Sequence, residues 1–507
     1  MADGMHDAGR PSPTLGRRLL DGVERAGNAL PHPATLFVLL SAAVVLLSAL
    51  LAALGVQVSH PLTGEAVPVL NLAGAAGLRR LALGFVPNFV NFAPLGPVLV
   101  SLLGLSVAER SGLLGAVVRR IVHAAPARVL TPVLVLCGAL SHTVGDVGYV
   151  LLIPLGAALF HSMGRHPLAG LAAAFYGVSG GFAANVLLSP TDVVLAGLTQ
   201  EAARLLDPQA VVTPMANYWF LAASVLFVTV SGTLVTERVV APRLGAYRGA
   251  YPAEPQAPLS PAERRALRWA LAAAVALAGL IAWGLLPADG VLRDPERPAM
   301  VDSVVVRGLV FFLFVGGLVP GLVYGALAGS IRSERDLYRG MEENLALVAG
   351  YLVVVFFIAQ FVNLFAWSNL GVVLAVHGAT ALKSLALGPV PLLLLLVLFT
   401  AILDLVLGSA AAKWAMLGPV LVPMLMLLGS PPELTQAAYR VGDSITNIIT
   451  PLASNFPLVL MFVQRYEPEA GIGTVTATML PYSLANLLVW PLLLVGWMLL
   501  GWPLGPG

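Results

Sequence analysis

The chain has 507 residues, of which 58% are hydrophobic and only 11% are charged, and its mean hydropathy is +0.87. Soluble domains carry about 25% charged residues, so this composition excludes an ordinary soluble protein and predicts an integral membrane protein. The net charge is only +2 and the arginines gather in loops, which argues against a nucleic-acid partner. Cys137 is the only cysteine, so an intrachain disulfide and a cysteine-based metal site are excluded.

Residues 1–33 are polar and contain several arginines, and the apolar run that follows them is too long for the core of a signal peptide. We therefore interpret them as a cytoplasmic leader to a first spanning helix. A span needs about 20 apolar residues, and this criterion predicts an all-α polytopic membrane protein. The candidate spans are about 34–55, 88–107, 129–143, 147–163, 217–236, 268–286, 303–327, 345–366, 388–406 and 476–500.

Two further apolar stretches contain small residues, a proline and polar groups at positions that would break a spanning helix. Backbone groups freed at membrane depth must be satisfied by protein or water. We therefore predict two re-entrant hairpins, at about 166–199 and about 407–428, with two ordinary kinked helices as the alternative. One interrupted segment in each half is typical of secondary transporters with inverted-repeat-like halves.

The Pro-rich residues 241–266 are predicted to be a cytoplasmic loop between a first membrane half, 34–240, and a second, 267–507. Arginine clusters fall on one side of the membrane if the predicted spans alternate. Because cytoplasmic loops are rich in arginine, we expect a cytoplasmic N-terminus in a multi-pass protein of the bacterial inner membrane. The clusters are residues 10–25, 110–128, 238–268 and 332–339.

Several charged residues lie inside apolar segments, where each costs about 2.5–3.5 kcal/mol on insertion scales. For any one of them a structural ion pair is the simple explanation, but the whole set favours a functional site. They are Asp146, Asp192, Asp404, Lys413, Arg440 and Asp443. Two of them repeat a pattern, because Val144-Gly-Asp146 and Val441-Gly-Asp443 are each followed after seven residues by Pro-Leu.

Arg440 and Asp443 lie one helical turn apart. Arginine is a permanent cation whose planar fork suits a carboxylate, so Arg440 is the candidate for holding an anionic substrate. A buried carboxylate binds a proton or Na+, which makes Asp443, Asp404 and Asp146 candidates for the coupling ion. Asp443 could instead simply neutralise Arg440.

Neutral polar and aromatic residues accompany the predicted breaks. Asn185, Ser189, Asn447 and Thr450 have groups suited to ligand or ion coordination. Trp414 is expected to face an aromatic ligand in a cavity, with an interfacial tryptophan as the alternative. No Gly-x4-Gly-Lys-Ser/Thr motif is present, so an ion gradient with H+ or Na+ as coupling ion, rather than a nucleotide, is the expected energy source.

At these segments the chain resembles the p-aminobenzoyl-glutamate transporter (AbgT) family. The resemblance rests on Gly177-Val-Ser-Gly-Gly-Phe-Ala-Ala-Asn185, Ser189-Pro-Thr-Asp192, Ala412-Lys-Trp414 and the run from Leu434 to Pro451. It implies an inner-membrane homodimer with nine spanning helices and two hairpins around a bowl that opens to the cytoplasm. It also implies ion-driven transport of aromatic glutamate conjugates, or export of sulphonamide antimetabolites.

The resemblance further implies that one set of motif residues serves substrate passage: Asp192, Trp414, Pro432, Arg440, Asp443 and Pro451, with Asn185 near the coupling ion. Two positions depart from the family pattern. Ala411 replaces a common Ser, which removes a hydroxyl group, and Asp404 replaces a common Asn, which adds an ionisable group near the ion site. Asp404 and Asp443 would then be the ligands of any bound Na+.

Three functions follow as hypotheses. The first is a secondary transporter of p-aminobenzoyl-glutamate-like aromatic carboxylates. The second is an anion transporter for dicarboxylates or short-chain fatty acids with similar hairpins. The third is a membrane-embedded enzyme with paired aspartates, although the sequence contains no nucleophile or metal motif to support it.

Overall fold

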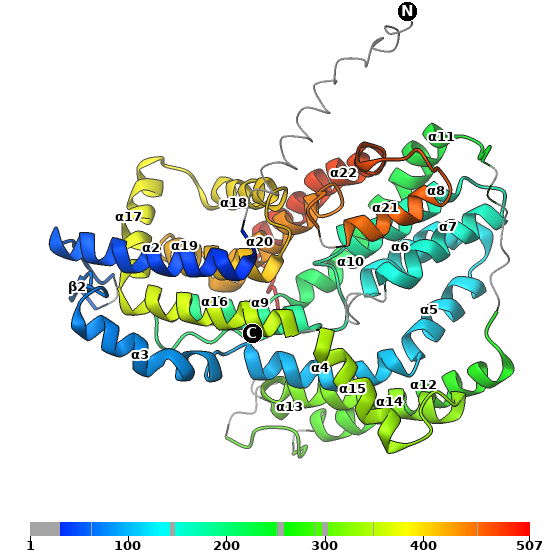
Figure 1. Ribbon diagram of the computed structural model, residues 1–507, viewed down its shortest axis with the longest axis horizontal. Helices are drawn as coiled ribbons and strands as arrows, with labels where there is room; N and C mark the ends of the chain where they lie inside the picture. Colours follow the sequence, from blue (N-terminus) through cyan, green and yellow to red (C-terminus); the bar gives the residue numbers. More distant parts are fainter. Residues whose placement is uncertain are drawn as a thin grey trace, which may run out of the picture.

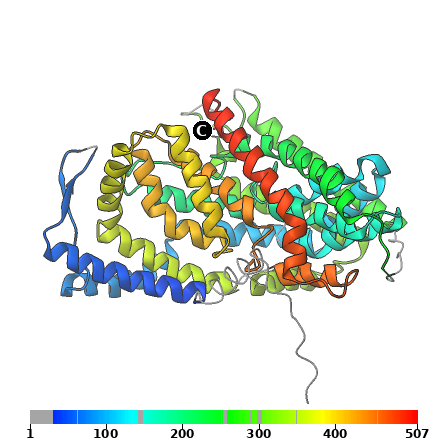
Figure 2. The ribbon, with the colours of Figure 1, turned by 90° about the horizontal axis from the view of Figure 1, so that it is seen from above.

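The computed structural model describes residues 31–61, 63–141, 148–249, 251, 258–287, 289–296, 303–347, 349–453 and 455–506. The described chain is almost entirely helical (Figure 1). The exception is a short antiparallel ribbon in which β1 (Gln57–Ser59) pairs with β2 (Ala66–Pro68) through Val58 opposite Val67. This ribbon projects from one end of the molecule (Figure 2).

Seven helical segments of the described chain are long and apolar enough to cross a membrane. An eighth is formed if the bent pair α17 (Leu370–Ser384) and α18 (Pro389–Asp404) counts as one, although the two helices meet at 119°. The seven are α2 (Pro33–Ala53), α3 with α4 (Ala75–Val90 and Leu95–Arg110), α10 to α11 (Tyr218–Val235 and Ala241–Leu244), α12 (Pro261–Leu285), α14 (Leu309–Ala328), α16 (Ala349–Trp367) and α22 (Ile472–Leu499).

Two predicted spans are wrong as simple spans. The segment predicted at 129–143 is the short helix α6 (Leu130–Leu140), and that at 147–163 is the π-helical turn η3 (Gly148–Leu152) followed by α7 (Ile153–Ser162). Most of the apolar side chains of these helices are buried inside the protein, so their hydrophobicity reflects helix packing rather than contact with lipid. Five further helices are short or amphipathic. They are η1 (Ala127–Val129), α5 (Leu113–Ala124), α13 (Val304–Arg307), α15 (Glu334–Leu347) and α21 (Phe456–Gln464).

The first predicted hairpin is a helix, a break and a second helix. Helix α8 (Pro167–Phe175) runs into the π-helical turn η4 (Tyr176–Gly180), and α9 (Pro190–Ala203) follows a non-helical stretch. Protein groups satisfy the exposed backbone of this break, because Asn486 Nδ2 donates to Gly180 O (3.0 Å) and Ala183 N donates to Ser444 Oγ (3.2 Å). Such internal partners permit irregular backbone at membrane depth.

The break predicted inside 407–428 is wrong, because α19 (Ala410–Met426) is one continuous helix. Pro419 and Pro423 lie within it, and each removes only one backbone hydrogen bond, which a buried helix in a bundle tolerates. The turn comes later, at Gly429 with φ +86°, and leads into α20 (Pro432–Thr446).

Helix α20 lies between two hydrophobic cores near the centre of the molecule (Figure 1). Its Ala437, Ala438 and Val441 belong to the core shared with α6, α8, α10 and α22. Its Tyr439 belongs to the second core, which is built from α2, α9, α16 and α19. Every residue from Leu434 to Thr446 is buried, so any charge on this helix needs a partner within the protein.

Ion pairs join three of the four arginine clusters. Arg119 of α5 pairs with Glu263 of α12 (2.8 Å), and Arg110 of α4 pairs with Glu343 of α15 (3.2 Å). These contacts join α5 to α12 and α4 to α15, so parts of the clusters 110–128, 238–268 and 332–339 lie on helices that contact one another, whereas residues 10–25 lie outside the described residues. The predicted cytoplasmic side of the clusters stays a prediction. Helix α12 starts at Pro261 with a capping box between Ser260 and Glu263, so the predicted loop 241–266 is shorter at its C-terminal end.

Candidate functional site

The candidate site is built around α20. Residues spaced by three and four along a helix share one face, so Gln436, Arg440 and Asp443 project together from α20. That helix contacts α9 of the first hairpin and also α18 and α19. Each of the three polar side chains meets its own partner on one of these helices.

Arg440 pairs with the first hairpin. Its Nη1 lies 2.6 Å from Asp192 Oδ1, and both side chains are buried, with 3% and 0% of their surface exposed. The other carboxylate oxygen of Asp192 accepts from Ser189 N (2.6 Å), Ser189 Oγ (2.7 Å) and Asn185 Nδ2 (3.0 Å). Asp192 is the third residue of α9, where a carboxylate both completes a capping box and is favoured by the helix dipole. We call these four residues the Arg440 clamp.

The Arg440 clamp has two buried atoms with unused hydrogen-bonding capacity. Arg440 Nη2, a donor, and Asn185 Oδ1, an acceptor, have no partner among the described residues. Buried polar groups are nearly always paired, so an orphan donor and an orphan acceptor in one cluster indicate a ligand site. When one nitrogen of a planar guanidinium already donates to a carboxylate, its free nitrogen can donate to a second carboxylate.

Asp443 pairs with the second half of the chain rather than with Arg440. Lys413 Nζ of α19 forms ion pairs with Asp443 Oδ1 (2.5 Å) and with Asp404 of α18. All three side chains have 0% to 2% of their surface exposed. With every group ionised, the two carboxylates and the one ammonium carry a net charge of −1. We call these residues the Lys413 triad.

Hydrogen bonds from α20 and the residues after it orient the Lys413 triad. Thr446 Oγ1 donates to Asp404 Oδ2 (2.9 Å), and Thr450 Oγ1 to the carbonyl of Asp404 (3.3 Å). Asn447 Nδ2 donates to Asp443 Oδ2 (3.4 Å). Gly442 allows α18 and α20 to approach, since a Cβ there would lie 2.4 Å from Val397 O.

Trp414 belongs to a third buried chain of hydrogen bonds. Its Nε1 donates to Thr199 Oγ1 of α9 (2.8 Å), and Thr199 Oγ1 donates in turn to Gln436 Oε1 (2.5 Å). Gln436 Nε2 then donates to Asn217 Oδ1 (2.8 Å). The indole is fully buried and stacked on Tyr439, with ring centroids 4.3 Å apart. In this arrangement Tyr439 covers the ring face that we expected a ligand to contact.

The profile of the AbgT transporter family matches residues 18–507. The chain is also 38% identical, over 98% of both sequences, to the p-aminobenzoyl-glutamate transport protein of Escherichia coli K12. This chain belongs to the AbgT family. The expected family and the fold class of a polytopic helical membrane transporter are therefore confirmed.

Two solved AbgT-family structures share the fold. The YdaH transporter of Alcanivorax borkumensis, described as having an unusual topology, is 46% identical, with a TM-score of 0.90 over 94% of this chain and all of its own. MtrF of Neisseria gonorrhoeae, described as illuminating a class of antimetabolite efflux pumps, is 44% identical, with a TM-score of 0.91 over 97% of this chain and all of its own.

The structure brings most of the predicted site residues together around α20 and leaves a few at its edge. Pro432 is the first residue of α20, and Pro451 lies in the non-helical stretch that follows this helix. Asp146 lies outside the described residues. The simple neutralisation of Arg440 by Asp443 is wrong, because their ion-pair partners are Asp192 and Lys413.

Sequence reasoning missed the polar chain of Thr199, Gln436 and Asn217. One signal was present, because Gln436 lies one turn before Arg440 on the same helix face. Lys413 was recognised as a buried charge but was given no role. Its position nine residues after Asp404 gave no indication that one ammonium would contact both carboxylates.

Asp404 Oδ1 and Asp443 Oδ1 contact the Lys413 ammonium, so a Na+ ion held by these two oxygens would take the place of Lys413 Nζ. The second oxygen of each carboxylate accepts a hydrogen bond, Asp404 Oδ2 from Thr446 Oγ1 and Asp443 Oδ2 from Asn447 Nδ2. Among the described residues, no group of three or more His, Cys, Asp and Glu side chains is placed to hold a metal ion.

Proposed function

We propose that this protein is an ion-gradient-driven secondary transporter of p-aminobenzoyl-glutamate-like aromatic carboxylates. The name of the Escherichia coli relative supports the substrate class. The carrying observation is the free Nη2 of the buried Arg440, a permanent cation with one nitrogen left for a second carboxylate. The description of MtrF supports a second cargo class, antimetabolites such as sulphonamides, which share the aromatic amine of the p-aminobenzoyl group.

A substrate carboxylate on Arg440 competes with Asp192 for the guanidinium. Because Asp192 caps α9, weakening the 2.6 Å ion pair loosens the first hairpin from α20. Substrate binding and hairpin movement are thereby linked, since a ligand moves an equilibrium only through contacts that differ between two states. Asn185 Oδ1 supplies an acceptor for an N–H of the substrate.

We propose the Lys413 triad as the coupling site, with H+ as the ion. Its net charge of −1 is buried, and burial of an unbalanced charge is costly. One proton on either carboxylate makes the triad neutral, whereas Na+ has to displace the Lys413 ammonium. The two other buried charges on α9 and α20, Asp192 and Arg440, balance each other, whereas Glu201 and Glu433 lie near the ends of these helices and are only partly buried.

The direct test is flux of p-aminobenzoyl-glutamate into proteoliposomes under an imposed gradient. We expect gradient-dependent flux in the wild type and none in Arg440→Ala. Flux that is independent of any gradient, or flux unaltered by Arg440→Ala, would overturn the proposal. Succinate or butyrate displacing the conjugate at low concentration would favour the dicarboxylate or fatty-acid transporter instead, and chemical alteration of the substrate would favour an enzyme.

We also propose a homodimer in the bacterial inner membrane with a cytoplasmic N-terminus. The arginine clusters at 110–128, 238–268 and 332–339 support the orientation, because such clusters mark cytoplasmic loops. Light scattering of the purified protein tests the dimer. Protease protection of an N-terminal tag in right-side-out and inverted vesicles tests the orientation.

A further inference from the structure

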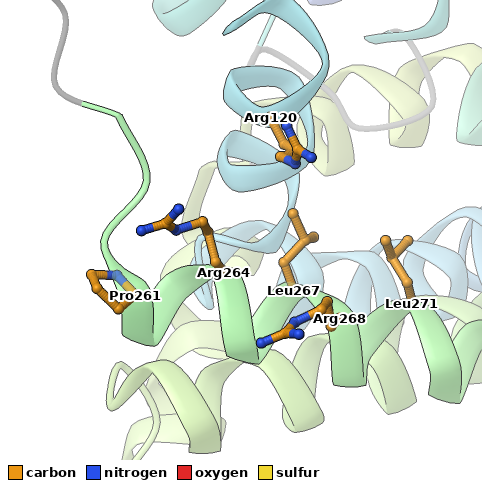
Figure 3. Close-up of a pocket in the computed structure, with 6 residues that line it drawn as sticks. All are labelled: Arg120, Pro261, Arg264, Leu267, Arg268 and Leu271. Atoms are coloured by element: carbon orange, nitrogen blue, oxygen red, sulfur yellow. The ribbon is translucent and has the colours of Figure 1, made fainter. Parts of the chain in front are cut away.

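A surface pocket of about 580 Å³ lies between α5 and α12, away from both ion networks. It is lined by one residue of α5 and five of α12, with Arg120 projecting toward the α12 side chains (Figure 3). The lining residues are Arg120, Pro261, Arg264, Leu267, Arg268 and Leu271. Three arginines at one small pocket make it strongly cationic.

No acidic side chain among the described residues neutralises these arginines. Within the described part of the chain, Arg120, Arg264 and Arg268 form no ion pair or side-chain hydrogen bond, whereas the adjacent Arg119 pairs with Glu263 (2.8 Å). Arg264 and Arg268 are four residues apart on α12 and therefore repel each other across one helical turn. An anion bound between them and Arg120 would remove this repulsion.

The pocket adjoins an exposed and mainly apolar side of α12. Trp269 is 58% exposed, as expected for a tryptophan at the level of the lipid headgroups. Beyond it the exposed side chains are apolar, with Leu271 49%, Val275 71% and Leu280 64% exposed. A cationic pocket is thus continuous with an apolar face that acyl chains can cover.

We infer that this pocket binds the phosphate headgroup of an anionic phospholipid, whose acyl chains lie along α12. Basic pockets beside spanning helices recognise such headgroups, and neutral lipids lack the required net charge. The pocket is at the surface and shares no residue with the buried Arg440 clamp, so the inference does not depend on the proposed substrate.

Native mass spectrometry of the intact protein in detergent, titrated with phosphatidylglycerol or with phosphatidylcholine of the same chain length, tests this site. We expect the wild type to bind phosphatidylglycerol more tightly. In Arg120→Gln/Arg264→Gln/Arg268→Gln this affinity should fall roughly 100-fold, because each of the three arginines contributes a factor of about five. A triple Lys variant should keep affinity within about threefold, since it keeps the charge.

The matched control is Arg238→Gln/Arg265→Gln/Arg335→Gln, which removes the same charge from exposed positions outside the pocket. It should bind phosphatidylglycerol like the wild type. Equal binding of both lipids by the wild type, or no effect of the pocket variant, would overturn the inference. Displacement of the lipid by millimolar inorganic phosphate would assign the pocket to a free anion. A change of oligomeric state without loss of lipid selectivity would assign it to a contact between copies of the chain.

Discussion

The Arg440 clamp and the Lys413 triad lie on neighbouring parts of one helix, but they differ in charge balance. In the clamp one guanidinium meets one carboxylate, and a donor and an acceptor are left free. In the triad one ammonium meets two carboxylates, so a negative charge is left over. The first arrangement can take in a polar ligand that brings its own carboxylate. The second is completed by a single proton.

This difference gives α20 two separable roles, one toward the substrate and one toward the ion. It also links them mechanically, because Arg440 and Asp443 are one turn apart on the same buried helix. Binding measurements and gradient-driven flux should therefore tell the two networks apart, with clamp substitutions lowering substrate affinity and triad substitutions lowering ion coupling.

Removing the triad ammonium with Lys413→Met should be the most damaging change. It leaves two buried carboxylates without their cation, which costs about 3–5 kcal/mol of stability. Thermal unfolding in detergent should show a large fall in Tm that Asp404→Asn partly restores in the double variant. The control is Lys383→Met at an exposed position of α17, which should change stability by less than about 0.5 kcal/mol. Equal Tm values for the two lysine variants would contradict the buried triad.

Arg440→Ala should abolish tight substrate binding while the protein remains folded. Hydrogen bonds to a charged group contribute about 1.5–3 kcal/mol, so affinity for p-aminobenzoyl-glutamate should fall roughly 10- to 100-fold. Asp192 keeps its bonds to Ser189 and Asn185, which limits the structural loss. Calorimetric titration measures the effect, and Arg440→Lys should be intermediate because it keeps charge but not the fork.

The control for Arg440→Ala is Arg204→Ala at the exposed end of α9, where the nearest acid, Glu201, is 4.0 Å away. Its substrate affinity should match that of the wild type. A comparable loss in both variants would mean that overall positive charge, rather than the clamp, attracts the substrate.

Gly442→Ala should push α18 and α20 apart and disturb the triad from its backbone side. The added Cβ would lie 2.4 Å from Val397 O and 2.7 Å from Thr400 Cβ, and overpacking of this kind costs about 1–3 kcal/mol. Gly418→Ala on α19 is the control, because its Cβ would meet Trp414 at an ordinary 3.6 Å. Unfolding curves should show a lower stability for Gly442→Ala than for Gly418→Ala. Identical curves would contradict the close approach of α18 and α20.

Trp414→Phe should have the smallest effect. It removes one hydrogen bond to Thr199, worth about 1 kcal/mol, and keeps the stack on Tyr439. Trp490→Phe is the matched control, since Trp490 Nε1 donates to Ser224 Oγ at the same 2.8 Å. If Trp414→Phe and Trp490→Phe lower Tm equally and leave KM equal, Trp414 only stabilises the fold. A rise of KM in Trp414→Phe alone would support the predicted contact with the substrate ring.

The sequence predicted the members of the site better than their pairing. The cost of burying a charge in an apolar segment was enough to single out Asp192, Lys413, Arg440 and Asp443. Pairing depends on which helices pack together, and Arg440 reaches an acid 248 residues away rather than Asp443 on the next turn. Local spacing gives no information on such contacts.

The fold could be predicted only in part for the same reason, because local sequence does not determine which helices pack together. Apolar runs located most helices, but hydrophobicity does not distinguish contact with lipid from contact with protein, so α6 and α7 were read as spans. Proline suggested a break within α19, yet Pro419 and Pro423 lie in an unbroken helix. Propensity is overridden by packing at these positions.

The most direct test of the two-network account is p-aminobenzoyl-glutamate flux in proteoliposomes containing wild-type protein or Asp404→Asn, driven by a pH gradient or by a Na+ gradient. The account predicts that a pH gradient alone drives the wild type. In Asp404→Asn this stimulation should be lost while substrate affinity stays within about threefold, because one carboxylate and one ammonium already balance. Flux driven by Na+ in the wild type, or full pH-gradient stimulation in Asp404→Asn, would contradict it.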